Sequence, residues 1–290
     1  MSETIASISV IIPTHDRTDL LARTLESVAN QTLAPVEIIV VDDLNTPATR
    51  ALVESFNASS RLDVQYIDGS GLPKKSAGAS RNLGAASARS SLFAFLDDDD
   101  YWAPNYLERC VEKHESTGAE LVLTWSHKVI DGQLSVGMTP TAESFRTVHP
   151  GMTGSNMFIS KAAFDRVSGF DPNMWVLNDV DLFIRLRDAG TSMDVVSSRL
   201  VFHEGRGAGH LSSRSERRAL GLEEFLAKHE ADLSVAGRRS VVRRIHRART
   251  GPDHRIPVRV LHTVALLFYT RPSGFYGTIK RRVLFQKRMH

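Results

Sequence analysis

Leu92-Phe93-Ala94-Phe95-Leu96 leads directly into Asp97-Asp98-Asp99-Asp100 and then Tyr101-Trp102, so an apolar run of strand length ends in four carboxylates. Four adjacent like charges repel one another and are costly unless water or a cation neutralises them. Open α/β sheets present ligand-binding side chains at the carboxyl ends of their strands, and carboxylate oxygens suit Mg²⁺ or Mn²⁺. The stretch predicts a cation site at the end of a buried strand, with a solvated acidic turn as the alternative.

The composition is that of an ordinary globular protein, with 42% apolar and 24% charged residues among 290. This length allows one large α/β domain with an appendage, or two small domains. The single cysteine, Cys110, excludes an intrachain disulfide and a Cys-rich zinc site and fits a reducing compartment. Because no signal peptide and no run of roughly 18 apolar residues is visible, we expect a cytoplasmic location.

Charge is divided unevenly along the chain. Residues 235–290 hold 14 Lys or Arg and one acid, whereas the part before them holds 22 basic and 32 acidic residues. A basic tail on an acidic body suggests an anionic partner for the tail. The basic amphipathic stretch 237–250 can lie on an anionic membrane surface, or it can pack on the acidic body or on a second subunit. No aromatic interleaving supports a nucleic-acid partner.

The first third of the chain alternates between strand and helix patterns. A β-branched run over 8–12 ends at Pro13, helical spacing follows over 18–30, and a second strand over 36–41 runs into Asp42-Asp43. This order is the βαβ signature of a nucleotide-binding half-domain. Further strands are expected over 62–67, 119–125, 154–159 and 195–203, and further helices over 46–56, 80–86, 104–117, 161–167 and 178–189.

Six motifs occur in one order along roughly residues 7 to 215. They are Ser9-Val10-Ile11-Ile12-Pro13-Thr14, Val40-Val41-Asp42-Asp43, Ala79-Ser80-Arg81-Asn82-Leu83-Gly84, Phe95-Leu96 with Asp97 to Asp100, Ser168-Gly169-Phe170-Asp171 and Asn178-Asp179-Val180-Asp181-Leu182. In this set and order the chain resembles the family 2 inverting glycosyltransferases of the GT-A fold. The resemblance implies a Rossmann-like mixed sheet flanked by helices over 1–215, with a nucleotide-sugar half (about 1–125) and an acceptor half (126–215), followed by a basic helical extension over 216–290.

The resemblance also implies residues for the donor nucleotide. Pro13 and Thr14, with Asp16 in the same turn, match the positions that hold base or ribose, although a simple strand-ending turn would look the same. Asp43 matches the residue that bonds the uracil or thymine ring, with a helix N-cap as the alternative. Arg81 matches a position near the diphosphate, where a guanidinium makes charge-assisted bonds. An exposed basic residue at a helix start is the alternative for Arg81.

The acidic stretch takes the place of the family's metal-binding element. Asp99 is expected to bind Mn²⁺ or Mg²⁺, with Asp97 as a further ligand, and Asp97 or Asp98 to contact sugar or ribose. Asp100 matches a position with a structural role. His203 matches a histidine that completes the metal's coordination in some relatives, with His210 as its rival.

Asp179 is the implied catalytic base, because inverting transfer needs one carboxylate to deprotonate the acceptor hydroxyl. The family usually places Glu before this Asp, whereas this chain has Asn178, so we expect a lower pKa for Asp179 than in relatives. Asp181 is an alternative base, and acidic capping of the helix start is an alternative role for both aspartates.

The sequence as a whole predicts metal-dependent, inverting transfer of one sugar from a UDP- or dTDP-sugar to a hydroxyl acceptor, which could be a polysaccharide, a lipid-linked glycan or a small natural product. The segment Gln-x-x-Arg-Trp of processive relatives is absent. Two rivals stay open. A catalytically silent nucleotide-sugar-binding or membrane-recruitment protein is compatible with Asn178, and a sugar nucleotidyltransferase is less compatible, because it would carry a Gly-rich basic loop after the first strand. Peripheral contact at the inner face of the membrane, or a homo-oligomer, is an option for the basic extension.

Overall fold

A computed structural model describes residues 7–205, 215–251 and 256–269. The chain divides into two compact units, residues 1–207 and residues 208–290, and each is described by itself. His210, the rival of His203, lies outside the described residues. Within the described ranges, no helix is long and apolar enough to cross a membrane.

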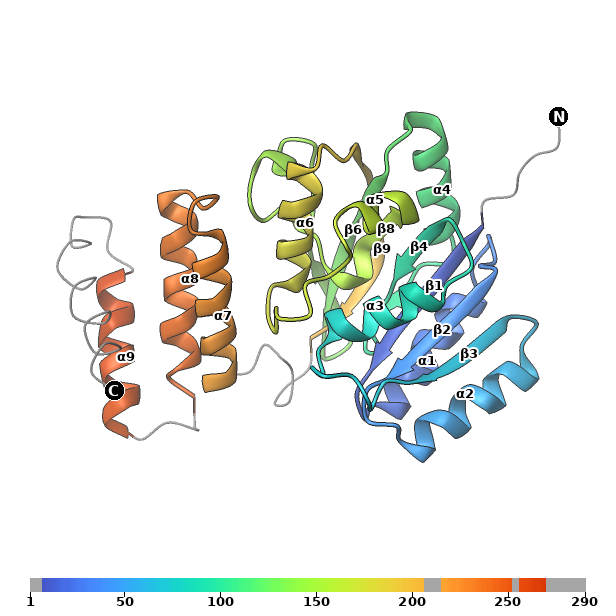
Figure 1. The fold of residues 1–290 in the computed structure, drawn as a ribbon, viewed down its shortest axis with the longest axis horizontal. Coiled ribbons are helices and arrows are strands. Elements are labelled where there is room, and N and C mark those ends of the chain that lie inside the picture. Colours follow the sequence, from blue (N-terminus) through green and yellow to red (C-terminus); the bar gives the residue numbers. More distant parts are fainter. Residues whose placement is uncertain (1–6, 206–214, 252–255, 270–290) are drawn as a thin grey trace. The chain divides into compact units, whose positions relative to one another are not determined.

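The first unit is built on one mixed sheet, ordered β3-β2-β1-β4-β8-β6-β9-β5, with β7 paired to β6. β1 to β4 run parallel, β8 is antiparallel to both β4 and β6, and β9 runs parallel to β6 (Figure 1). The strands are β1 (Ile8–Thr14), β2 (Glu37–Asp42), β3 (Asp63–Asp68), β4 (Leu92–Phe95), β5 (Tyr101–Trp102), β6 (Leu121–Ile130), β7 (Gln133–Val136), β8 (Met157–Ser160) and β9 (Met193–Glu204).

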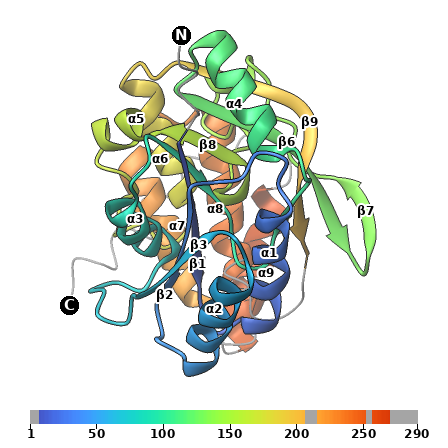
Figure 2. The ribbon, with the colours of Figure 1, turned by 90° about the vertical axis from the view of Figure 1, so that its right-hand side faces the viewer.

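Helices cover both faces of this sheet. They are α1 (Thr18–Ala29), α2 (Pro47–Ser59), α3 (Ala77–Ser87), α4 (Tyr106–Thr117), α5 (Lys161–Arg166) and α6 (Asn178–Asp188), with short 3₁₀ turns η1 (Ser144–Arg146) and η2 (Gly154–Asn156). Figure 2 shows α3 and α5 on one side of β1 and α1, α2 and α4 on the other. All seven residues of β1 are buried, as expected for a strand that is covered on both faces.

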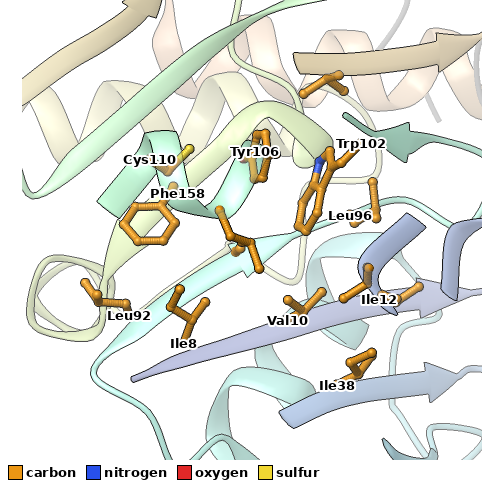
Figure 3. Packing of buried hydrophobic residues seen from close by; sticks show 14 of the residues in the cluster. Ile8, Val10, Ile12, Ile38, Leu92, Leu96, Trp102, Tyr106, Cys110 and Phe158 are labelled. Carbon is orange, nitrogen blue, oxygen red and sulfur yellow. The ribbon is translucent and has the colours of Figure 1, made fainter. Parts of the chain in front are cut away.

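Successive residues of the central strands serve the two faces in turn. Ile8, Val10 and Ile12 join the core cluster that includes the apolar stripe of α1 and Trp102, Tyr106 and Cys110 (Figure 3). The opposite face of β1 presents Ile11 to α3, where a Cβ on Gly84 would lie 2.6 Å from the Ile11 side chain. A glycine at position 84 therefore lets α3 lie close to the sheet and bring its N-terminal half to the edge where β1 and β4 end.

Most elements lie where the sequence predicts them, and three do not. The strand predicted over 154–159 begins as the turn η2, because the Asn156 side chain accepts from the Thr153 backbone N–H at 2.7 Å and tightens the chain into a helical turn. The two-residue strand β5 is too short to leave a sequence pattern. The strand predicted over 119–125 continues as β6 to Ile130 and pairs with β7.

The second unit contains α7 (Glu216–His229), α8 (Val235–Ala248) and α9 (Ile256–Tyr269). α7 and α8 form a hairpin that buries Leu222 and Phe225 of α7 with Val241 and Ile245 of α8. Arg249 ties the hairpin together, because its guanidinium bonds Glu216 at 2.9 Å and Glu223 at 2.8 Å. The predicted basic helix over 237–250 corresponds to α8, whereas α7 lies in the extension predicted as helical over 216–290, where no bounds were predicted for it.

Candidate active site

The four carboxylates that follow β4 are bonded to protein groups, and three of them are buried. Asp98, Asp99 and Asp100 are 4–7% exposed, so the alternative of a solvated acidic turn is wrong. Thr24 of α1 holds the turn from within, since its hydroxyl lies 3.0 Å from the Asp98 carbonyl oxygen and 2.8 Å from that of Asp100. The partners of these carboxylate side chains come from different elements of the fold, and Asp98 and Asp99 share one of them.

Asp98 binds the turn that follows β1. Its carboxylate accepts from the Thr14 hydroxyl at 2.8 Å, from the His15 backbone N–H at 3.2 Å and from the Arg17 guanidinium at 3.1 Å. Because the Thr14 hydroxyl is bonded to Asp98, only the backbone groups of Thr14 are left to contact a ligand. Asp16, at the tip of this turn, is exposed and has a positive φ of 51°.

Asp99 shares the Arg17 guanidinium with Asp98, at a distance of 2.9 Å. Burial raises the pKa of Asp99 to about 7, and the neighbouring charges of Asp100, Asp97 and Asp98 act in the same direction. Arg17 opposes this rise, because a nearby cation favours the ionised carboxylate. Arg17 therefore supplies one positive charge to two buried carboxylates, Asp98 and Asp99.

Asp97 is paired with Arg81, which comes from α3. The Arg81 side chain is only 4% exposed, so the alternative prediction of an exposed basic residue at a helix start is wrong. Arg81 also reaches Asn178 Oδ1 at 3.4 Å and lies 5.2 Å from the Phe170 ring centre. One guanidinium thus connects the acidic turn to the start of α6.

Asp100 organises the far side of the turn. Its carboxylate accepts from the Ser155 hydroxyl at 2.5 Å and from the Glu204 backbone N–H at 3.1 Å, and it lies 2.6 Å from His203 Nδ1. Burial lowers the pKa of His203, but the charge of Asp100 and its hydrogen bond outweigh burial and raise the pKa overall. The second ring nitrogen, Nε2, faces the Thr153 hydroxyl at 3.3 Å. A histidine oriented through one nitrogen by a carboxylate has the arrangement typical of metal-binding histidines.

The two aspartates at the end of β2 have different partners. Asp42 accepts from the Leu44 and Thr46 backbone N–H groups at 3.0 and 2.7 Å, and so shapes the turn that starts α2. Asp43 is 6% exposed and lies 2.6 Å from His15 Nδ1. The helix N-cap considered as the alternative for Asp43 is not seen, because Thr46 is the N-cap residue of α2. Asp43 is directed toward the loop that follows β1.

Asp179 and Asp181 lie in the first turn of α6 in different surroundings. Asp181 is fully buried and its carboxylate accepts from Arg185 Nε and Nη2 at 2.9 and 2.8 Å, which leaves it unsuited to take a proton from a substrate. Asp179 is partly buried and accepts from the Val180 N–H at 2.8 Å. Desolvation raises its pKa above the ordinary carboxyl value, against the charges of His149 and Arg81. The comparison of this pKa with relatives stays a prediction.

Sequence reasoning missed Arg17 and Ser155. Arg17 belongs to the turn Thr14-His15-Asp16-Arg17 directly after β1, and β1 and β4 are parallel neighbours. The carboxyl ends of neighbouring parallel strands lie at the same edge of a sheet. A basic residue that follows one strand is therefore close to acidic residues that follow its neighbour. That signal was present in the sequence. Ser155 carried none, since η2 reaches the acidic turn only through the fold.

The donor atoms of this site suit a hard divalent cation, although the described residues contain no cluster of three or more His, Cys, Asp or Glu side chains arranged to hold one. Mg²⁺-type ions often bind one or two carboxylates and take their other ligands from substrate phosphates and water. Asp97, with a side chain 34% exposed, and Asp99 fit such a partial set. A separate surface hollow of about 650 Å³ borders the start of β4 at Leu92, at the opposite edge of the sheet.

Comparison with known proteins decides the family. The glycosyl transferase family 2 model matches residues 9–168, more than half of the chain. The chain belongs to glycosyl transferase family 2. Validoxylamine A glucosyltransferases from Streptomyces hygroscopicus subsp. limoneus and subsp. jinggangensis are 31% and 30% identical to this chain over alignments of 265 positions. These alignments cover 77% of this chain and 56% and 61% of the two relatives. This family 2 chain thus spans little more than half the length of these curated relatives.

Solved structures confirm the predicted GT-A fold. S. aureus TarS 1–349 in complex with UDP-GlcNAc has a TM-score of 0.63 at 18% identity, over 91% of this chain and 82% of its own. The mannosyltransferase PcManGT from Pyrobaculum calidifontis, in complex with GDP-Man and Mn²⁺, has a TM-score of 0.65 at 16% identity, over 99% of this chain and 82% of its own. At these identities the likeness extends to the fold alone.

Proposed function

We propose that this family 2 chain transfers a single sugar, with inversion, from a UDP- or dTDP-sugar to a hydroxyl acceptor in a metal-dependent reaction. The observation that carries the proposal is the link made by Arg81, which pairs with Asp97 of the acidic turn and reaches Asn178 beside Asp179. Through this link, a cation that could bind the donor's diphosphate lies near a carboxylate that could act as a base. We assign the reaction to residues 1–215 and treat 216–290 as an extension.

Asp179 is the base in this proposal. Its pKa lies above that of an ordinary aspartate because burial disfavours its charge, and a base works best when its pKa approaches the working pH. The fully buried Asp181, held by Arg185, positions the first turn of α6. Asn178 is uncharged, whereas an acid at this position would partly neutralise Arg81. The positive charge of Arg81 is therefore more available to an anionic group of the donor.

The other residues of the site bind and orient the donor. Asp43 accepts from the N–H of a uracil or thymine ring and Pro13, Thr14 and Asp16 border the base and ribose through the turn after β1. Asp97 and Asp98 face the ribose or the donor sugar. Asp99 and Asp97, with His203 oriented by Asp100, would hold Mn²⁺ or Mg²⁺, which stabilises negative charge on the departing diphosphate. Support comes from the neighbours, one solved with UDP-GlcNAc and one with GDP-Man and Mn²⁺.

The rival proposals predict different chemistry at the same site. A silent nucleotide-sugar-binding protein would keep donor binding and release no nucleotide in the presence of any acceptor. A nucleotidyltransferase would carry a Gly-rich basic loop after β1, where this chain has His15, the exposed Asp16 and Arg17, which is paired with Asp98 and Asp99.

The test measures nucleotide release and nucleotide binding in matched variants of α6. We expect Asp179→Asn to lower kcat by about 10²–10⁴-fold, the usual contribution of a general base, with little change in the Kd of UDP. Asp188→Asn is the control, because Asp188 is an exposed residue at the other end of the same helix. Full turnover by Asp179→Asn would show that another group is the base. Absence of any release in the wild-type protein, across UDP- and dTDP-sugars and acceptors, would favour the silent binding protein.

A further inference from the structure

Helix α9 carries an apolar stripe that faces away from the helix on which it packs. His262 lies 2.7 Å from His246 of α8, measured between the Nδ1 atoms, so this side of α9 faces α8. With 100° per residue, Val260 and Val264 lie about 160° from His262 on the helix surface. Val260, Leu261 and Val264 are 55%, 66% and 43% exposed. Together with Pro257 they have the spacing i, i+3, i+4, i+7 of a single helix face.

Arginines lie along the line where α8 and α9 meet, on the side of α9 away from the apolar stripe. Arg239 and Arg243 precede His246 by seven and three residues, so they lie on the same face of α8 as the histidine that contacts α9. Arg259 precedes His262 by three residues and is exposed. Long arginine side chains can extend their charged ends to the polar side of an interface while the stripe is buried.

A second group of arginines extends the positive surface across α8 toward α7. Arg244 and Arg247 are three residues apart on α8 and so lie on one side of the helix, and α7 packs on α8. Burial, followed by the charges of Arg244 and Arg247, lowers the pKa of Arg218 of α7. Residues 235–290 contain one acid, Asp253, against 14 basic residues. Arg249 is not part of this surface, because Glu216 and Glu223 neutralise it.

We propose that α9 lies in the surface of an anionic lipid bilayer, with its apolar stripe inserted and the arginines of α8 and α9 on lipid headgroups. An apolar face opposite an arginine-rich polar face is the pattern of helices that bind in the interfacial plane. Each Arg near an anionic bilayer contributes about 1 kcal/mol, and the apolar stripe adds an attraction that salt does not screen. The proposal goes beyond sugar transfer and stands independently of it.

The experiment uses the full chain and vesicle flotation. Wild-type protein should float with vesicles of phosphatidylcholine containing about 30% phosphatidylglycerol and should not float with pure phosphatidylcholine. Since each Arg contributes about 1 kcal/mol, Arg243→Gln and Arg259→Gln should each weaken binding about fivefold. Leu261→Glu should weaken it at least tenfold at both low and high salt. Leu220→Glu is the matched control, because Leu220 is a 47% exposed leucine on α7 in the same unit, and its variant should bind as the wild type does.

Several results would overturn the proposal. Equal flotation with charged and uncharged vesicles would show that the arginines do not bind lipid headgroups. Unchanged flotation of Leu261→Glu would show that the apolar stripe does not insert into the bilayer. A self-associating wild type that Leu261→Glu turns into a monomer, without vesicle binding by either, would identify a second copy as the occupant. Arginine-dependent binding to nucleic acid with no flotation would identify a nucleic-acid surface. Circular dichroism of each variant controls for loss of helix, and nucleotide release should be the same in all of them without vesicles.

Discussion

Replacing Arg17 by methionine tests whether this side chain is the built-in counter-ion of the acidic turn. One guanidinium nitrogen lies 3.1 Å from Asp98 and 2.9 Å from Asp99, whose side chains are 5% and 11% exposed, whereas the Arg17 side chain is 30% exposed. Methionine keeps much of the apolar stem and removes the charge. The variant therefore leaves two enclosed carboxylates without this cation and changes packing little.

The expected loss follows from the burial of the partners. Removing one partner of a fully buried pair costs about 3–5 kcal/mol, and an exposed pair is worth about 0–1 kcal/mol. Because Arg17 is partly exposed and its partners are not, we expect a loss of about 1–3 kcal/mol in the free energy of unfolding. Asp99 can offset part of this by staying protonated, so the loss should grow as the pH rises from about 6 to 8.5.

Urea unfolding of the wild type and Arg17→Met, with and without Mn²⁺ and UDP, measures both effects. A divalent cation should restore most of the lost stability, because it supplies the charge that Arg17 provided. Arg109→Met is the control, since Arg109 pairs with Glu112 on the exposed face of α4 and should change stability by less than about 0.5 kcal/mol. Equal unfolding midpoints for the wild type and Arg17→Met, with the same response to Mn²⁺, would refute the reasoning.

A Cβ on Gly154 of η2 would collide with the guanidinium of Arg81, so Gly154→Ala should displace this group and weaken UDP-sugar binding at least tenfold, as measured by calorimetry. Gly71→Ala is the control and should bind normally, because a Cβ on Gly71 would meet nothing within 4 Å. Asp99 has a pKa of about 7 in the folded chain against 3.8 for its unperturbed value, so without metal the stability should fall as the pH rises from about 4 to 7 and then level off. Metal ligands must be deprotonated, so the affinity for Mn²⁺ with UDP should rise up to about tenfold per pH unit below 7; an affinity that is flat from pH 5.5 to 8 would exclude Asp99 as a ligand.

Much of the nucleotide-binding half could be predicted because its signals are local. The β-branched run of β1, the apolar stripe of α1 and the strand–acid junction after β4 each lie in one short segment. Parallel neighbours β1 and β4 end at one edge of the sheet, so Asp98 and the turn after β1 had to meet there. The family's motifs and their order were likewise present in the sequence.

The sequence by itself determined that four carboxylates would follow a buried strand and that something positive had to neutralise them. Only the tertiary structure decided what does so: Arg17 from the turn after β1, Arg81 from α3 and His203 from β9 each reach a different carboxylate. These groups come from 10 or more residues away along the chain, and local patterns do not encode which side chains meet at such separations. The physical reason is that a buried charge must be paired, and the fold alone sets which partner lies within reach.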